Sequence, residues 1–374
     1  MAVYKIFPES DTFIFTEEIL GNAGLDEILE LGGYPVAGIG QTSRIITKFD
    51  TAKIQDTINN KVSGAGFQAK LHLSLASAYE LPTSYSVNTY PLYDQYTTGV
   101  GKFQDLPVDK SGASWLYRSP AALASRWTVP SVVVNMPTGV TGSYNSTYQG
   151  GGGSWYTGSN GVNLEAVETY NLNSTHDLDI DITNAVTLHY SGSIVNNGYI
   201  TKLSNDLEFN TASSIRLKYY GKDTNTIYPP SLDIKWDDSV YATGSLSLLT
   251  SDNSVISITN NKGKYINSGK QRFRISAKPK YPVRSFSTGS IYLTNYALPQ
   301  SSTWAIRDEF TDEMIIDFDS TYTKISCDSQ GSYFDMYLDG VQPERYYRVL
   351  IKAELGSTNT VVDADSVFKV VRNG

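Results

Sequence analysis

Alternation of apolar and polar side chains is the clearest pattern along this chain. In the stretch 69–76, Leu71, Leu73 and Leu75 are each separated by one polar residue. Because successive side chains of a strand point to opposite faces, this period of two predicts a strand with one buried face. Comparable short runs predict further strands at 43–50, 177–182, 214–219, 231–236, 244–249, 255–258, 272–276, 314–318 and 346–353.

Turn residues separate these runs, and helical periodicity is scarce. Asn197 and Gly198 suit a tight hairpin turn, where a backbone φ above zero is needed. A turn or a short helix is expected only at 52–61 and 116–126. Many short strands with regular turns are typical of antiparallel β-sandwiches rather than of a parallel βαβ sheet. We therefore predict an all-β fold.

The chain of 374 residues is long enough for two domains. A change of composition near 237–242 separates a part with glycine-rich loops from a part in which strands are closely spaced. We expect an antiparallel β-sandwich at 1–240 with a long insertion at about 85–165. A second sandwich, immunoglobulin-like or jelly-roll, is expected at 241–374. Long loops rich in glycine and tyrosine should join the strands.

Charge and hydropathy argue against several classes of function. A net charge of −8 and a pI near 5.0 disfavour nucleic acid as the main partner, because phosphate binding needs a basic face. No run of about 18 apolar residues occurs, so we expect no membrane insertion. The first eleven residues contain one lysine and no apolar core, so we expect no secretion signal there.

Sequence motifs for catalysis are missing. The chain has no HExxH, P-loop or GxSxG motif, and its three histidines lie far apart. A single cysteine, Cys327, excludes an intramolecular disulfide and a cysteine-based zinc cluster. Acid-rich stretches at 308–313 and 317–319 lack a glycosidase signature, and no β-helix repeat is visible. We expect the protein not to be an enzyme and to need no cofactor.

Three aspartates on one predicted strand are the candidate cation ligands. Asp177, Asp179 and Asp181 share one strand face, and Ca²⁺ prefers several oxygen ligands. The remainder of an EF-hand loop does not follow them. A solvated strand face, or protection of a sheet edge against aggregation, explains the same residues. We therefore expect no metal site, with these three carboxylates as the alternative.

Aromatic residues in the expected insertion supply the candidate interaction residues. The chain has 27 tyrosines and 30 glycines, and the insertion contains the glycine run 150–153. So long a loop is either a flexible surface loop or a contact loop whose aromatics bind a neighbour. The rings themselves suit core packing, subunit contact or stacking on sugar rings. The candidates are Tyr93, Tyr96, Trp115, Trp127, Tyr144, Tyr148, Trp155 and Tyr156.

Five stretches in the first 240 residues follow an order that is known from one family. They are 8–14 with 22–24 and 29–32, then 44–50, then 69–75, then 179–186 with 196–203, and finally 230–236. Together they resemble the DNRLRE, or disaggregatase-related, family of β-sandwich modules. The stretch 44–50 is similar to its "R-x-L-x-x-F-D" strand, and 179–203 is similar to its "D-V-T … N-x-G-x-x-L" hairpin. Independently of the family, the strand pattern places Ile45 and Phe49 inward and Arg44 near an edge.

The resemblance implies two settings for the protein. Family members include carbohydrate-binding modules of secreted polysaccharide-active enzymes, and similar chains are virion structural proteins of tailed bacteriophages. The missing secretion signal, the low charge and the C-terminal region 245–374, which resembles a second sandwich of the kind that phage particles carry, favour the virion.

We therefore expect a structural component of a tailed-phage virion, such as a neck, collar or tail decoration or a fibre-anchoring protein. It would be assembled in the host cytoplasm and would act by protein–protein contacts. The expected partners are other neck, tail or fibre subunits and copies of itself, and host-surface polysaccharide is a further candidate. The alternative is a glycan-binding adhesin or carbohydrate-binding module.

Overall fold

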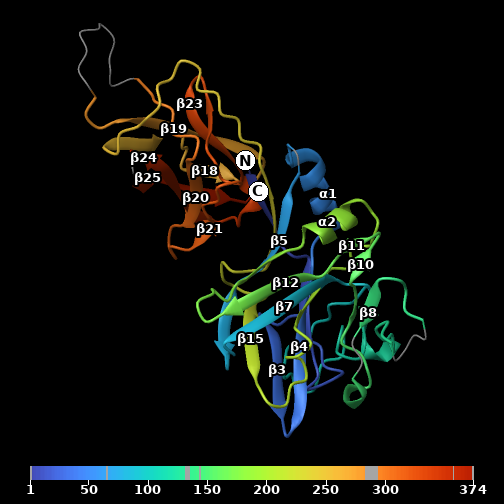
Figure 1. Ribbon diagram of the computed structural model, residues 1–374. Coiled ribbons are helices and arrows are strands. Elements are labelled where there is room, and N and C mark those ends of the chain that lie inside the picture. The colour runs from blue at the N-terminus through green and yellow to red at the C-terminus, as the bar shows by residue number, and fades with distance from the viewer. Residues whose placement is uncertain are drawn as a thin grey trace. The chain divides into compact units, whose positions relative to one another are not determined.

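Figure 1 shows the computed structural model of the chain, which describes residues 2–64, 66–130, 135–142, 145–282, 294–356 and 358–372. Strands hold 44% of the residues and helices hold 8%. Most strands belong to large antiparallel sheets. The predicted all-β fold is therefore confirmed.

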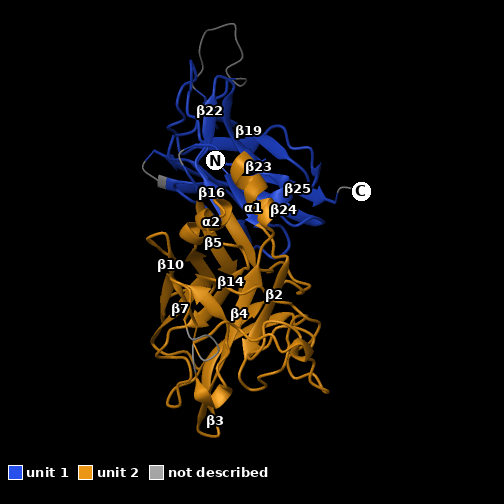
Figure 2. Ribbon diagram, turned by 90° about the vertical axis from the view of Figure 1, so that its right-hand side faces the viewer, with its two compact units in different colours: residues 1–5, 60–67, 234–374 blue, residues 6–59, 68–233 orange. Residues whose placement is uncertain are grey.

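The chain divides into two compact units, which Figure 2 shows in two colours. Unit 2 consists of residues 6–59 and 68–233, and unit 1 consists of 1–5, 60–67 and 234–374. The chain enters the long part of unit 1 at Ile234, close to the change of composition at 237–242. The expectation of separate sandwich domains at 1–240 and 241–374 stays a prediction.

Two short segments from the N-terminal part of the chain belong to unit 1 because their side chains pack there. Tyr4 Oη donates to Asp339 Oδ2 at 3.0 Å, and the Tyr4 ring lies edge-on to Tyr337 with centroids 6.0 Å apart. Lys61 Nζ lies 4.7 Å from the Tyr4 ring centroid and 3.9 Å from Asp339 Oδ2. Composition does not reveal such contacts, because Tyr4 and Asp339 lie 335 positions apart in the chain.

The main sheet of unit 2 has eight strands, and Figure 1 shows part of it, with β12 beside β7. The strand order is β12-β7-β14-β4-β3-β15-β6, with β2 also paired to β4. Every residue of β14 is buried, so both faces of the sheet are covered at its centre. The strands are β2 (Ser10–Phe15), β3 (Ile28–Val36), β4 (Ile39–Lys48), β6 (Leu75–Tyr79), β7 (Ser84–Pro91), β12 (Ala166–Asn171), β14 (Tyr199–Leu203) and β15 (Ile215–Tyr220).

The alternating stretch 69–76 contributes to two strands instead of one. β5 (Gln68–Leu73) pairs with β13 (Leu178–Asp181), whereas β6 begins at Leu75 and pairs with β15. Leu71 and Leu73 are fully buried, as the alternation predicts. The chain changes from one sheet to the other at Ser74. Because the alternation continues unbroken from Leu73 to Leu75, the pattern does not predict this change.

A helix follows β13 where the sequence suggested a hairpin. α2 (Thr183–Tyr190) separates β13 from β14, and these two strands belong to different sheets. Gly198 does have a positive φ of 104°, but it lies on the path from α2 into β14. The expected helix at 52–61 is confirmed as α1 (Thr51–Asp56) followed by the π-helical turn η1 (Thr57–Lys61).

Unit 1 contains a four-stranded and a five-stranded sheet that share one core. Trp304 stacks on Phe334 with centroids 4.6 Å apart, and Phe273 lies 5.2 Å from Phe368. No strand forms at 244–249, where Leu248 makes only an isolated bridge. The sheets are β17 (Ser254–Ile258), β19 (Lys270–Pro279), β23 (Gly331–Tyr337) and β22 (Ser326–Asp328), and β18 (Lys264–Ile266), β25 (Thr358–Val371), β24 (Arg345–Leu355), β20 (Thr303–Asp308) and β21 (Met314–Ile316).

The remaining elements are short. β1 (Ala2–Ile6) and β16 (Ser231–Trp236) are neighbours in a further sheet. The stretch 116–126, where a helix was one possibility, holds one 3-10 turn. The short elements are η2 (Ala121–Leu123), β8 (Val140–Gly142), η3 (Ser146–Tyr148), β9 (Ser154–Tyr156), β10 (Gly158–Ser159), β11 (Val162–Asn163) and η5 (Leu338–Gly340).

Candidate functional site

The long insertion of unit 2 packs on one face of the eight-stranded sheet. Ile14, Ile46 and Ile200 project from β2, β4 and β14 into a core cluster that also contains Trp115 and Trp127 of the insertion. The cluster is apolar and its aliphatic members are fully buried. The described part of the insertion is therefore a fixed layer of the fold, and not the flexible surface loop that its composition allowed.

Four of the eight candidate aromatics belong to this core. Trp115, Trp127, Tyr148 and Trp155 expose 1%, 0%, 6% and 5% of their surface. Their polar atoms are used internally, since Trp127 Nε1 donates to Ser114 O at 2.9 Å and Tyr148 Oη donates to Gly40 O at 2.8 Å. Rings this deeply buried offer little surface to a neighbour. For these four, the burial supports core packing, which is one of the roles that the sequence left open. Their role in a contact with a neighbour stays a prediction.

Three further candidates stay half-buried near the surface. The rings of Tyr93 and Tyr156 meet edge to face with centroids 5.3 Å apart. Tyr96 Oη lies 3.0 Å from Ser10 Oγ, and burial raises the pKa of Tyr96. The last candidate, Tyr144, lies outside the described residues.

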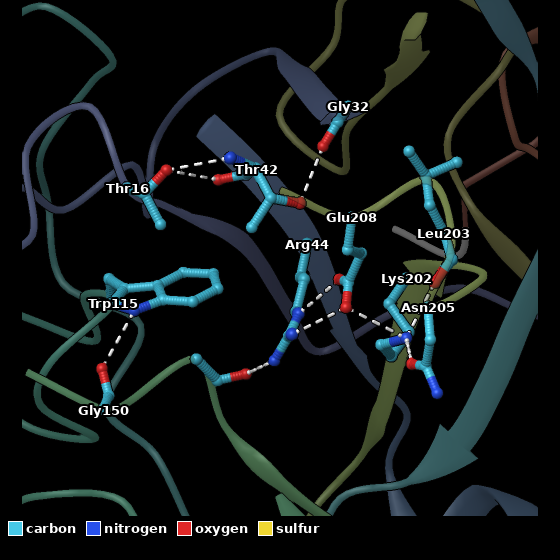
Figure 3. Close-up of polar contacts among 11 residues, drawn as sticks. Thr16, Gly32, Thr42, Arg44, Trp115, Gly150, Lys202, Leu203, Asn205 and Glu208 are labelled. Atoms are coloured by element: carbon cyan, nitrogen blue, oxygen red, sulfur yellow. Dashed lines mark hydrogen bonds and ion pairs between the residues drawn. The ribbon is translucent and has the colours of Figure 1, made fainter. Parts of the chain in front are cut away.

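A buried ion cluster joins the insertion to the sheet, as Figure 3 shows. The side chains of Arg44 and Glu208 are 0% and 3% exposed, and they form two parallel hydrogen bonds of 2.7 and 2.9 Å. Lys202 Nζ donates to Glu208 Oε2 at 3.0 Å, to Leu203 O at 2.7 Å and to Asn205 Oδ1 at 2.9 Å. All three donors of the ammonium group have an acceptor, as a buried charge requires.

The insertion completes the coordination of Arg44. Its guanidinium group donates to the backbone carbonyl of Gly152 and lies 4.8 and 5.2 Å from the ring centroids of Trp115 and Trp155. These are cation–π distances, which add to the attraction in a desolvated site. The strand pattern predicted that Arg44 lies near an edge, and this prediction is wrong. Its face of the sheet is covered, and the cluster partners are supplied from elsewhere in the sequence.

Gly152, in the glycine run 150–153, is required by this contact. Gly152 has a φ of +81°, and a Cβ atom there would lie 2.6 Å from Trp115 Cζ2 and 2.7 Å from an Arg44 nitrogen. Glycine alone allows both this backbone conformation and this approach. Gly152 therefore serves close packing on Arg44 and Trp115, and a Cβ atom at Gly153 would lie 2.7 Å from Ile200 Cδ1.

Electrostatically, the cluster holds two cations around one fully shared carboxylate. Burial lowers the pKa of Lys202, Glu208 opposes this shift, and the neighbouring Arg44 adds to it. Sequence reasoning missed Glu208, because 164 positions separate it from Arg44 and no local pattern connects them. A lone buried arginine in a covered strand is the signal that could have prompted the search for a partner.

A second anchor of the insertion is Asn22, which is 1% exposed. Its Nδ2 donates to Thr98 O at 2.7 Å and to Ala113 O at 2.8 Å. Its Oδ1 accepts from Gly24 N at 3.2 Å and from Gly101 N at 2.9 Å. One side chain thus holds two loops of the insertion against the segment that precedes β3.

We expect Asn22→Ala to lower the free energy of unfolding by about 3 kcal/mol, because it leaves several buried backbone groups without a partner. Urea unfolding followed by tryptophan fluorescence measures this loss. The matched control is Asn145→Ala, whose side chain caps the turn η3 through Thr147 N at 2.9 Å. A cap of that kind contributes about 1 kcal/mol. Equal losses for the two variants would contradict the anchoring role of Asn22.

The anchored loops carry exposed aliphatic side chains at their tips. We call residues 97–126 the lobe. Within it Val100, Leu106 and Leu123 expose 62%, 92% and 67% of their surface. Backbone hydrogen bonds link its segments, among them Thr97 N to Arg118 O and Ala121 N to Lys110 O. The lobe is thus a fixed surface that displays apolar groups to solvent.

The three candidate cation ligands have separate protein partners. Asp177 Oδ1 accepts from Leu75 N at 2.6 Å, Asp179 pairs with Lys70 at 2.7 Å, and Asp181 accepts from Gln68 at 2.8 Å. Each carboxylate is thus engaged in holding its own neighbour. Within the described ranges, no three His, Cys, Asp or Glu side chains gather in a way that fits a metal ion.

Two comparisons bear on the identity of the chain. No family model matches it, and no curated protein matches it either. In the described part of the chain, no helix has the length and apolar character needed to cross a membrane.

Proposed function

We propose that this protein is a structural component of a tailed-phage virion, a neck, collar or tail decoration or a fibre-anchoring subunit that acts through protein–protein contacts. Each unit is interpreted as a β-sandwich. The virion setting follows from the resemblance of the strand motifs to the DNRLRE family. The mode of action follows from the way the chain uses its side chains.

One observation carries the proposal, namely the anchored lobe. Asn22 and the Arg44 cluster fix the insertion, and the lobe then presents Leu106 at 92% exposure and Leu123 at 67%. Fixed loops lose little conformational freedom when a partner binds, so exposed apolar groups on them favour docking. A catalytic site needs converging polar groups, whereas the two polar clusters that anchor the insertion are engaged within the fold.

Mass spectrometry of density-purified phage particles from the producing culture tests the proposal. We expect peptides of this chain to co-sediment with the tail proteins at a fixed ratio through successive density gradients. Recovery of the chain only in the soluble fraction would overturn the virion assignment.

The alternative function, glycan binding, is favoured by one specific feature. Tyr93 and Tyr156 form a half-buried aromatic pair at the surface, and amphipathic rings of this kind stack on sugars. If the alternative holds, the double variant Tyr93→Ala and Tyr156→Ala should abolish the binding of host-surface polysaccharide in isothermal titration calorimetry. Under a pure assembly role, in which polysaccharide is not a partner, wild-type protein and the double variant give no heat of binding.

A further inference from the structure

The buried ion cluster brings three different functional groups together at the side-chain nitrogen of Lys202. The side chain of Lys202 is 2% exposed, and its Nζ donates to Asn205 Oδ1 at 2.9 Å and to Glu208 Oε2 at 3.0 Å. An amine, a primary amide and a carboxylate thus meet in one hydrogen-bonded group. A reaction that joins two side chains through an amide needs these three parts, namely a nucleophile, a carbonyl carbon with a leaving group, and a group that transfers protons.

Burial and a neighbouring charge prepare the Lys202 nitrogen to act as a nucleophile. Burial lowers the pKa of Lys202, and the charge of Arg44 lowers it further, against the opposing effect of Glu208. A lysine attacks a carbonyl carbon only as the neutral amine, and desolvation beside a second cation is a known way of populating that form. The neutral amine also leaves Arg44 and Glu208 as a balanced pair, whereas the ammonium group puts two positive charges against one negative charge.

The amide of Asn205 connects this cluster to the surface. Figure 3 shows its oxygen turned towards Lys202 and its nitrogen turned away. Asn205 as a whole residue is exposed, so ammonia that leaves from its Nδ2 has a short path to solvent. The chemistry can therefore proceed at a buried nitrogen while the product escapes.

The fold holds the reacting groups at close range. Lys202 belongs to β14, and Asn205 follows three positions later in the turn that leads to Glu208. Backbone hydrogen bonds from Leu207 N and Glu208 N to Ser204 O, at 3.0 and 3.1 Å, fix this turn. Fixed proximity replaces a chance encounter, and it accelerates reactions between side chains by many orders of magnitude.

We propose that Lys202 and Asn205 form an intramolecular isopeptide bond, with Glu208 transferring protons. Lys202 Nζ attacks Asn205 Cγ, and the electron pair of the broken Cγ–Nδ2 bond leaves with Nδ2. Two protons of the lysine ammonium group pass to Nδ2, at least one of them through Glu208 Oε2, which ends the reaction as a carboxylate. Nδ2 departs as an ammonium ion, so the reaction needs no oxidant, reductant or other reactant.

The bond removes a buried charge, which is the physical reason for it to form. A charge in a desolvated site is costly, and the product is a neutral secondary amide whose one N–H can still donate to Glu208. Arg44 and Glu208 then remain as a balanced pair with their two parallel hydrogen bonds of 2.7 and 2.9 Å. The inference goes beyond the proposed function and does not rest on it, because the reaction requires only that unit 2 is folded.

The mass of the intact chain tests the bond. Mass spectrometry of the purified full-length protein should give a mass about 17 Da below that calculated from the sequence, which is the mass of one ammonia. Lys202→Met lacks the nucleophile and should keep its full calculated mass. A wild-type chain of full mass overturns the inference. A loss of ammonia that persists in Lys202→Met also overturns it, because the loss then occurs at a different asparagine.

Digestion with trypsin locates the bond. Trypsin does not cleave after an acylated lysine, so wild-type protein should yield no free peptide 203–216, and Asn205→Ala should yield it. The internal control is Lys70, whose Nζ lies 2.7 Å from Asp179 on partly exposed side chains, and cleavage after Lys70 should occur in both proteins. Release of the peptide 203–216 from wild-type protein would contradict the bond.

Glu208→Gln tests the proton transfer. Glutamine keeps an oxygen that accepts hydrogen bonds but is no base, so this variant should keep its full mass for the time in which wild type reacts. The matched control is Glu165→Gln, since Glu165 acts on Lys202 through its charge and accepts a hydrogen bond from Asn88 Nδ2 at 2.8 Å. This control should form the bond. Equal reaction of Glu208→Gln and wild type would overturn the role of Glu208. If circular dichroism shows that Glu208→Gln is unfolded, the masses of wild type, Lys202→Met and Glu165→Gln decide the proposal.

Discussion

Replacing Glu208 with leucine should lower the free energy of unfolding by about 3–5 kcal/mol, the usual cost of breaking a buried ion pair from one side. The substitution leaves Arg44 and Lys202, both almost completely buried, without their shared carboxylate. Two like charges then face each other in a site that excludes water. Urea unfolding at pH 7, followed by the fluorescence of Trp115 and Trp155 beside Arg44, measures the loss.

The comparison with Arg44→Met makes this prediction specific. That variant keeps the pair of Lys202 and Glu208 at 3.0 Å, so its cost should be clearly smaller than that of Glu208→Leu. The matched surface control is Glu27→Gln, whose partner Lys102 lies at 2.7 Å with both side chains 47% exposed. Exposed pairs contribute at most about 1 kcal/mol. A larger loss for Arg44→Met than for Glu208→Leu would contradict the shared-carboxylate account.

A pH-dependent difference in stability is the second large effect, and it originates at Asp11. Burial raises the pKa of Asp11 to about 7, Lys222 N opposes the shift at 2.6 Å, and Asp223 adds to it. The folded protein therefore keeps a proton that the unfolded chain releases near pH 4. Stability from this group is present at low pH and is lost as the pH rises to 7, by up to about 4 kcal/mol.

His189 acts in the opposite direction. Burial lowers its pKa to about 4, the ring packs against Tyr199 at 5.5 Å, and Nε2 is buried without a hydrogen bond from another described residue. The folded protein thus holds a neutral imidazole, while the unfolded chain binds a proton below pH 6.5. The contribution of His189 is present above that pH and is lost as the pH falls towards 4, by up to about 3 kcal/mol.

Two variants separate these opposing effects. Relative to wild type, Asp11→Asn should gain stability as the pH rises from 4 to 7, and His189→Phe should gain stability as the pH falls from 6.5 to 4. Urea unfolding of the three proteins at half-unit steps of pH gives both differences. A difference from wild type that does not change with pH would show that the group titrates alike in the folded and unfolded states.

Local patterns in the sequence predicted the class of the fold and the inward face of several strands. Leu71 and Leu73 alternate with polar residues and are buried because a period of two reports directly on a sheet with one covered face. The same reasoning did not predict α2. It buries Ala185, Val186, Leu188 and His189 and exposes Asn184, Thr187 and Tyr190. Its eight residues are too few for the helical period to stand out in the sequence.

The candidate site depended on distant partners, which local patterns do not reveal. Aromatic composition identified the insertion as unusual, but it does not distinguish a ring in a core from a ring at a surface, and Trp115 and Trp155 are in the core. Glu208 and Asn22 owe their roles to residues more than 70 positions away. The exposed aliphatic side chains of the lobe could not be identified from the sequence, because composition does not show which apolar residues of the insertion are buried and which are exposed.

The mass of the purified full chain in solution, by light scattering with and without host-surface polysaccharide, tests the central claim most directly. If the protein acts by contacts between protein subunits, it should form a stable oligomer, with at least twice the monomer mass of 41.2 kDa. This mass should not change when polysaccharide is added. A monomer whose mass rises on addition of polysaccharide would contradict the account and support the glycan-binding alternative.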